Sequence, residues 1–261
     1  MNQAERRMFL IRALLAEQPE RYREMSIPAD THEQKRLLRA LFNVRPPMPA
    51  LPEFLRVQDT YLQKELADQG VTDADALDEL RNGLCLWRDD ITTLKCDVIV
   101  NAANSALLGC FFPNHGCIDN AIHTYAGVQL RLACNEIMEK QGHEEAVGTS
   151  KITPAFNLLS RYVLHTVGPF VHSHVIQRDR ELLASYYRAY LDLAERQGLR
   201  SVTFCCISTG EFHFPNELAA RIAIQTVGEH EAVRQNRIRV IFNVFKEQDE
   251  SIYRRLLCPA D

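Results

Sequence analysis

The chain has 261 residues, of which 46% are hydrophobic, with a formal net charge of −4 and a pI near 6.2. This length and apolar content suffice for one sizeable domain with an extension, and the missing basic excess argues against nucleic-acid or anionic-membrane partners. There is no apolar run of transmembrane length, and the N-terminal MNQAERRMFLIRALL lacks both a long apolar core and a small-residue cleavage site, so we expect neither a membrane span nor a secretory signal.

Residues 1 to 80 show helical periodicity in two or three pieces, such as AERRMFLIRALLAE and EQKRLLRALFNV. The Pro-rich stretch RPPMPALPEF interrupts this pattern and indicates a stiff linker. We therefore predict a helical N-terminal extension over residues 1–75, followed by a second domain over residues 76–261.

From Leu84 onwards, short apolar runs alternate with longer helical patterns, which predicts an α/β sandwich with a mostly buried mixed sheet. The expected strands are GLCLW, CDVIVN, RYVLHTV, SVTFCCIS and RVIFNVF. The expected helices are IDNAIHTYAGVQLRLACNEIMEKQG, RDRELLASYYRAYLDLAERQG and NELAARIAIQTVGEH, the first two closed by Gly142 and Gly198.

The eight cysteines lie outside any small, loop-rich framework, which is typical of a reducing compartment where thiols are free, catalytic or bound to metal. We therefore expect a cytoplasmic protein. In an open α/β sheet, ligands bind beyond the carboxyl ends of the strands, so the residues that follow each apolar run are the functional candidates.

Asn101 and Asn104 lie where the strand CDVIV gives way to a loop. An Asn side chain both donates and accepts hydrogen bonds, which suits sugar hydroxyls, although Asn at a strand end is also a common turn residue. After SVTFCC, the residues Ser208, Thr209 and Gly210 offer hydroxyls and backbone N–H groups before the next helix, an arrangement that binds phosphates. A plain connecting turn has a similar sequence.

The segment GCFFPNHGCIDNAIH, residues 109–123, places Cys110, His115 and Cys117 within eight residues. One interpretation is that the two cysteines are small buried hydrophobes and the histidine is a surface residue. The other is that C-x4-H-x-C binds metal. Three protein ligands without a fourth nearby describe a catalytic zinc site with an open position, in which two thiolates leave the ion a moderate Lewis acid.

With these features together, the sequence resembles a macrodomain, and within that superfamily the zinc-dependent branch of protein-ADP-ribose hydrolases. The resemblance covers roughly residues 75–258 and implies a three-layer α/β/α sandwich with a central mixed sheet behind the helical extension. The motifs that carry it, in the family's order, are DDIT (89–92), DVIVNAAN (97–104), GCFFPNHGCIDNAIH (109–123), YVLHTVGP (162–169) and ISTGEFHFP (207–215).

The resemblance also implies roles for individual residues. Asp90 and Ile91 match the pair that contacts adenine, and Asp119 and Asn104 match the residues beside the distal ribose, where we place catalysis. Cys110, His115 and Cys117 match the ligands of one zinc ion. The complete ADP-ribose-binding set is Asp90, Ile91, Asn101, Asn104, Ile118, Asp119, Asn120, Ser208, Thr209, Gly210, Glu211 and Phe212. One departure is Asp89, which stands where many macrodomains have glycine.

The implied activity is zinc-dependent removal of mono-ADP-ribose from modified protein side chains. Zinc either activates a water for attack at C1 of the distal ribose, with Asp119 as the base, or orients the ribose hydroxyls. The alternatives are a non-catalytic ADP-ribose reader and an O-acetyl-ADP-ribose deacetylase. Relatives of this branch tend to be encoded beside a sirtuin-type ADP-ribosyltransferase and a lipoyl-carrier protein of the glycine-cleavage type, which implies that the modified carrier is the substrate.

Other residues of chemical interest receive structural interpretations. We expect His123 to be a packed or capping histidine and Asp179 to be a first-turn acid favoured by the helix dipole. Aromatic Phe212 and Phe214 belong either over the ligand or in the core. We expect surface positions for His172 and His174, and core positions within a strand for Cys205 and Cys206.

Overall fold

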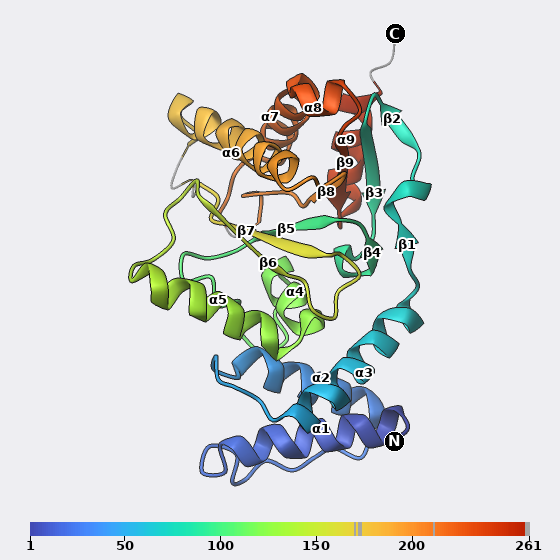
Figure 1. Ribbon diagram of the computed structural model, residues 1–261, viewed down its shortest axis with the longest axis vertical. Helices are drawn as coiled ribbons and strands as arrows, with labels where there is room; N and C mark the ends of the chain where they lie inside the picture. The colour runs from blue at the N-terminus through green and yellow to red at the C-terminus, as the bar shows by residue number, and fades with distance from the viewer. Residues whose placement is uncertain (170, 172–173, 211, 259–261) are drawn as a thin grey trace.

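The computed structural model describes residues 1–169, 171, 174–210 and 212–258, and its centre is a seven-stranded sheet within these ranges (Figure 1). The strands lie in the order β2-β3-β9-β8-β5-β7-β6. Their bounds are β2 Glu79–Arg81, β3 Leu84–Arg88, β5 Val98–Ala102, β6 Ser150–Pro154, β7 Tyr162–Thr166, β8 Ser201–Phe204 and β9 Arg239–Val244.

The sheet is mixed, as predicted. The five central strands run parallel, and the edge strands β2 and β6 pair antiparallel with β3 and β7. The central strands β5, β8 and β9 are buried almost throughout, which explains why they are continuous Val, Ile and Phe runs rather than alternating ones. A separate parallel pair joins β1, Thr72–Asp73, to β4, Leu94–Lys95.

Helices cover both faces of the sheet, which confirms the three-layer α/β/α arrangement (Figure 1). Helices α4, Ile118–Ala126, and α5, Val128–Gln141, lie on one face. The opposite face carries α6, Gln177–Arg196, α7, Asn216–Glu229, α8, Glu231–Arg234, and α9, Glu247–Leu257. Within the part of the chain that the structure describes, no helix has the length and apolar character that a membrane crossing needs.

Three N-terminal helices pack against α4 and α5 and form the end of the molecule away from the sheet (Figure 1). They are α1, Gln3–Glu17, α2, Thr31–Val44, and α3, Pro52–Gln69. Asn2 and Asp30 cap the first two, and Pro52 occupies the first turn of the third, so the Pro-rich stretch ends inside a helix. Their apolar faces form a second core that also includes Val128 of α5.

The helix predicted over residues 118–142 is two helices that break at Gly127. Gly127 has φ 91°, and a Cβ there would lie 2.5 Å from Nε2 of Gln58, a buried side chain of α3. The bend therefore follows from contact with the N-terminal helices, which a local sequence pattern does not reveal. Gly142 caps the second helix in the left-handed conformation, as predicted.

Candidate active site and metal centre

The predicted site residues lie at the edge of the sheet where the parallel strands end. The DDIT segment follows β3 as a short 3-10 helix, η2, Ile91–Thr93. The cysteine-rich loop follows β5, and the ISTGEFHFP segment follows β8, the neighbour of β5. Because the carboxyl ends of parallel strands share one edge, these three segments lie along the same edge of the sheet, where ligands bind in open α/β sheets.

The ligand atoms of Cys110, His115 and Cys117 all lie within 4.8 Å of one another. All three residues are half-buried. The turn that brings them together includes a backbone hydrogen bond from His115 to Phe112 and a left-handed residue, Asn114, with φ 55°. Two thiols and one imidazole form a donor set suited to zinc, which binds such ligands at roughly 2.0–2.3 Å.

Burial and, to a smaller extent, the neighbouring Cys110 raise the pKa of the Cys117 thiol to about 12, although a hydrogen bond from the backbone of Asn120 acts in the opposite direction. Two thiolates this close together would repel one another, so a cation bound between them would favour their ionised form. A divalent ion that displaces both thiol protons fits this donor set.

Asp119 lies in the first turn of α4, two residues after Cys117, and is only 5% exposed. Burial raises its pKa to about 6, and the hydrogen bond from Asn101, 2.8 Å from Nδ2 to Oδ1, acts in the opposite direction. Nε2 of His123, one turn along α4, lies 3.5 Å from the same oxygen. The carboxylate is thus held between β5 and α4 with a raised pKa.

Asn101 is completely buried, and it contributes to this site through Asp119 rather than through an exposed surface of its own. Its Nδ2 also lies 3.2 Å from Nδ1 of His165 on β7, and Nε2 of His165 lies 2.9 Å from the hydroxyl of Thr153 on β6. A buried polar chain therefore runs from β6 across β7 and β5 to Asp119.

Asn104 and Asn120 lie in different environments, although the sequence assigns both to the ligand. Asn104 is exposed, and its amide donates to the carbonyl of Gly109 at 3.3 Å. Asn120 is fully buried, and its amide donates to the carbonyls of Phe112 at 3.0 Å and Cys110 at 3.5 Å. Asn120 therefore holds the cysteine-rich loop from within, while half-buried Ile118 packs against the main core.

Asp90 caps η2, and its Oδ1 accepts hydrogen bonds from the backbone N–H and the hydroxyl of Thr92, at 2.9 and 2.7 Å. Ile91 is buried in the core. The carboxylate of Asp89 accepts a hydrogen bond from the backbone N–H of Asp90 at 2.8 Å, which fixes this turn without a glycine. The unusual residue therefore stabilises the conformation of the DDIT segment.

The segment after β8 makes a tight turn. Ser208 is buried in the left-handed conformation with φ 65°, and its carbonyl accepts from the backbone N–H of Phe214 at 2.9 Å. The hydroxyl of Thr209 donates back to the carbonyl of Cys206 at 3.0 Å, so it closes the turn. Gly210 follows this turn.

The two phenylalanines of this segment have different surroundings. Phe214 is 1% exposed and belongs to the core, whereas Phe212 is half-buried and its carbonyl accepts from Val171 at 2.9 Å. This bond ties the segment to the chain that follows β7. Glu211, a predicted ligand contact, lies outside the described residues.

The structure places the remaining residues of interest as follows. Asp179 accepts the backbone N–H of Ile176 at 3.0 Å, which confirms a first-turn acid. His174 is exposed, and His172 lies outside the described residues. Strand β8 ends at Phe204, so the prediction that Cys205 and Cys206 lie within it was wrong, although Cys205 is buried. All eight cysteines are free.

His123 is buried, which confirms the expected packed histidine, but two sets of contacts at this site were not found from the sequence. His123, Cys134 and His165 form a second, fully buried cluster beneath Asp119, whose members come from α4, α5 and β7. Arg39 of α2 contacts Asn120 and the backbone of His115. These contacts join segments far apart in the chain, so a local motif does not predict them even where it contains one of the residues.

Comparisons with known proteins agree with this architecture. The Macro domain family model matches residues 100–223. A protein-ADP-ribose hydrolase of Treponema medium is 53% identical over 261 residues, which cover 98% of this chain and 100% of that protein.

Solved structures give the same assignment. The Oceanobacillus iheyensis macrodomain with ADP is 38% identical and matches with a TM-score of 0.61 over 69% of this chain and 93% of that one. The Trypanosoma brucei macrodomain in complex with ADP-ribose is 28% identical and matches with a TM-score of 0.62 over 84% of this chain and 94% of that one. The chain therefore belongs to the macrodomain family of protein-ADP-ribose hydrolases.

Proposed function

We propose that this protein is a zinc-dependent hydrolase that removes mono-ADP-ribose from modified protein side chains. The proposal rests on one observation: the ligand atoms of Cys110, His115 and Cys117 lie within 4.8 Å of one another, and the buried Asp119 follows two residues after Cys117. The hydrolase relative and the nucleotide-bound macrodomains support the substrate class. A reader of ADP-ribose has no need for a three-ligand metal set next to a near-neutral carboxylate.

The ligand would extend along the crevice from adenine to the distal ribose. Asp90 would accept the exocyclic amino group of adenine through a carboxylate oxygen, beside the buried Ile91. The turn after β8 would bind the diphosphate through the backbone N–H groups near Ser208 and Gly210. Its approach to the amino end of α7 at Asn216 adds the favourable potential of a helix N-terminus.

Cys110, His115 and Cys117 would hold one zinc ion at the distal-ribose end. When bound, the ion supplies a Lewis acid of moderate strength, which either polarises a water or fixes the ribose hydroxyls. The free thiols of the chain suit a reducing compartment such as the cytoplasm.

Hydrolysis breaks the bond between C1 of the distal ribose and the modified side chain. Positive charge develops on the ribose in the transition state, and the negative Asp119 nearby would stabilise it. Asp119 would accept a proton as water adds its oxygen to C1, and the departing side chain takes a proton, so that free ADP-ribose and the unmodified protein are released. Asn104 would position a ribose hydroxyl from the exposed side of the loop.

The proposal is tested by incubating the purified full chain with a mono-ADP-ribosylated protein, and separately with O-acetyl-ADP-ribose, and measuring the free ADP-ribose released. A glycine-cleavage-type lipoyl carrier, modified by a sirtuin-type transferase, is the first protein substrate to use. We expect release from the protein. Binding without release would identify a reader, and release from O-acetyl-ADP-ribose alone would identify a deacetylase.

A further inference from the structure

The N-terminal helices reach the proposed metal loop directly. Arg39 of α2 donates from Nη2 to the backbone carbonyl of His115 at 3.1 Å and to Oδ1 of Asn120 at 2.9 Å. Its Nε donates to the same Oδ1 at 3.3 Å. The Arg39 guanidinium therefore contacts the backbone of a proposed zinc ligand, His115. It also contacts the side chain of Asn120, whose amide donates to the carbonyls of Cys110 and Phe112.

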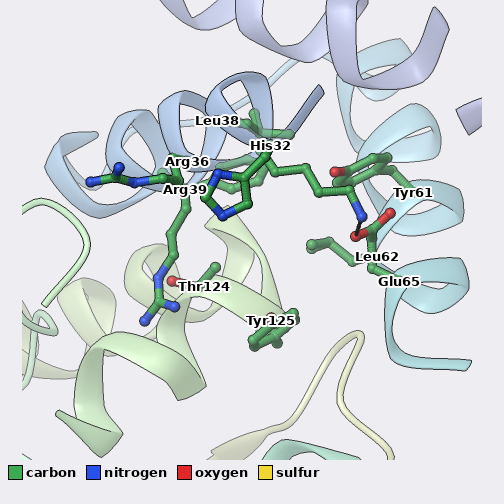
Figure 2. Close-up of a pocket in the computed structure, with 11 residues that line it drawn as sticks. His32, Arg36, Leu38, Arg39, Tyr61, Leu62, Glu65, Thr124 and Tyr125 are labelled. Carbon is green, nitrogen blue, oxygen red and sulfur yellow. Dashed lines mark hydrogen bonds and ion pairs between the residues drawn. The ribbon is translucent and has the colours of Figure 1, made fainter. Parts of the chain in front are cut away.

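Figure 2 shows the side chain of Arg39 leaving α2 and extending towards α4, where Thr124 lies. It borders a cavity of about 200 Å³ between α2, α3 and α4. Arg36, one turn earlier on the same helix, points away from α4 in this view and pairs with Glu33 at 3.3 Å. The two arginines are thus one turn apart on α2, but their side chains point in different directions.

A second residue of α2 contacts the same loop. Asn43 is 1% exposed, and its Oδ1 accepts the backbone N–H of Asn114 at 2.9 Å while its Nδ2 donates to the hydroxyl of Thr124 at 2.9 Å. Asn114 is the left-handed residue immediately before the ligand His115. Asn is one of the few non-glycine residues that adopt a left-handed φ readily, and this hydrogen bond fixes the turn at that conformation.

The macrodomain part of the chain holds α2 in return. Arg131 of α5 is 5% exposed and donates to the backbone carbonyls of Phe42 and Arg45 at the carboxyl end of α2. It also donates to the carbonyl of Leu108, just before the loop, at 2.7 Å. A buried cation among the last carbonyls of a helix is stabilised by the helix dipole. The end of α2 and the start of the loop are therefore fixed to the same guanidinium.

We propose that α2 is a positioning element of the metal site, in which Arg39 and Asn43 hold the Cys110–Cys117 loop in its ligand-presenting conformation. The inference rests on the proposed zinc-dependent function. The Oceanobacillus iheyensis macrodomain is matched over 93% of its length by only 69% of this chain, so the fold alone does not require the remaining length. The N-terminal helices would then belong to the catalytic apparatus through the loop that they support.

The test compares Arg39→Gln with Arg36→Gln in the full chain, since both remove one charge from the same helix. Zinc is loaded first, and its release to a chelator is followed. Residues that orient metal ligands typically contribute roughly 10–100-fold to metal affinity or activity. We expect Arg39→Gln to weaken zinc binding by about that factor and Arg36→Gln to leave it unchanged, with both variants folded by circular dichroism.

Cobalt(II) provides a readout of geometry that a merely structural role would not change. In the cobalt-loaded chain, the visible bands report the arrangement of the thiolate and imidazole ligands. Arg39→Gln and Asn43→Ala should shift or broaden these bands, while Arg36→Gln retains them. Identical cobalt spectra and identical zinc release for all three variants would overturn the proposed role of α2.

The failure of the zinc proposal gives a different result. If the unmodified chain binds neither zinc nor cobalt, the proposed function is wrong, and the proposed role of α2 is wrong as well. If the unmodified chain binds both metals and the Arg39 and Asn43 variants bind them equally well with unchanged spectra, only the role of α2 is wrong.

Discussion

Asn101 donates a 2.8 Å hydrogen bond to Asp119 and so ties the end of β5 to the first turn of α4. Both side chains are buried, and the bond favours the ionised carboxylate against the desolvation that raises its pKa. The result is a carboxylate of fixed orientation two residues from the proposed ligand Cys117.

Replacing Asp119 by Ala should abolish turnover selectively. A general base contributes roughly 10²–10⁴-fold to a rate, and we expect a loss of that order in kcat with ADP-ribose affinity and zinc content nearly unchanged. Single-turnover release of ADP-ribose, calorimetry and metal analysis measure the three quantities. Turnover within a few-fold of the unmodified enzyme would remove Asp119 from the chemical step.

Asp90 should contribute to binding and leave the metal unaffected, because adenine and zinc occupy opposite ends of the ligand. The carboxylate also caps η2 through Thr92, so two variants are needed. Asp90→Asn retains an oxygen for the cap but loses the negative charge, whereas Asp90→Ala loses both. We expect Ala to weaken ADP-ribose binding more than Asn, with equal zinc content in both. Calorimetry that gives unchanged affinity for both variants would contradict this role.

His165 should make the protein less stable in mild acid. Burial lowers its pKa from 6.5 to about 4, so between these values the unfolded chain binds a proton that the folded chain does not. The free energy of unfolding therefore falls as the pH drops from 6.5 towards 4, by up to about 1.4 kcal/mol per pH unit for this residue. Buried His123, whose pKa is also lowered, acts in the same direction, and Asp119, whose pKa is raised, acts in the opposite one.

Denaturant unfolding of the unmodified chain and His165→Gln across pH 4 to 7 isolates this contribution. The variant should be less stable at pH 7, because it loses the buried contacts to Asn101 and Thr153, but its stability should depend less on pH. Parallel pH profiles for the two proteins would show that His165 does not titrate as proposed.

Gly127 should be more sensitive to substitution than Gly142. Both have positive φ, of 91° and 74°, but a Cβ at Gly127 would lie 2.5 Å from Gln58, whereas a Cβ at Gly142 would have no neighbour within 4 Å. Gly142→Ala should therefore cost about 1 kcal/mol of backbone strain, and Gly127→Ala roughly 1–3 kcal/mol more, because its ψ of 176° at positive φ is confined to glycine and because Gln58 crowds the Cβ. Urea unfolding measures both, and equal losses would contradict this difference.

The sheet could be predicted from sequence because its central strands are continuous apolar runs bounded by turn residues, as in VIVNA and RVIFNV. The edge strand β6, SKITP, escaped prediction because it is only partly buried and therefore not a continuous apolar run. The helices α8 and α9 also went unpredicted. The four-residue α8 depends on tertiary packing more than on local propensity.

The candidate site could be predicted where a local motif carries it, as with Cys110, His115 and Cys117. The motif could not show that Asn120 faces inward or that Asn101 reaches the site through Asp119. Orientation depends on neighbours far away in the chain, such as Arg39, which is 81 residues from its partner Asn120. Residue types predict the chemistry, whereas their direction follows from packing.

The most direct test of the central claim is to measure bound metal and ADP-ribose release together on the unmodified chain and on Cys117→Ala. Cys117 is one of three proposed protein ligands, so its loss should release the ion. The account predicts about one zinc per unmodified chain, and neither zinc nor hydrolysis of a mono-ADP-ribosylated protein by the folded variant. Full hydrolysis by a metal-free Cys117→Ala protein would contradict it.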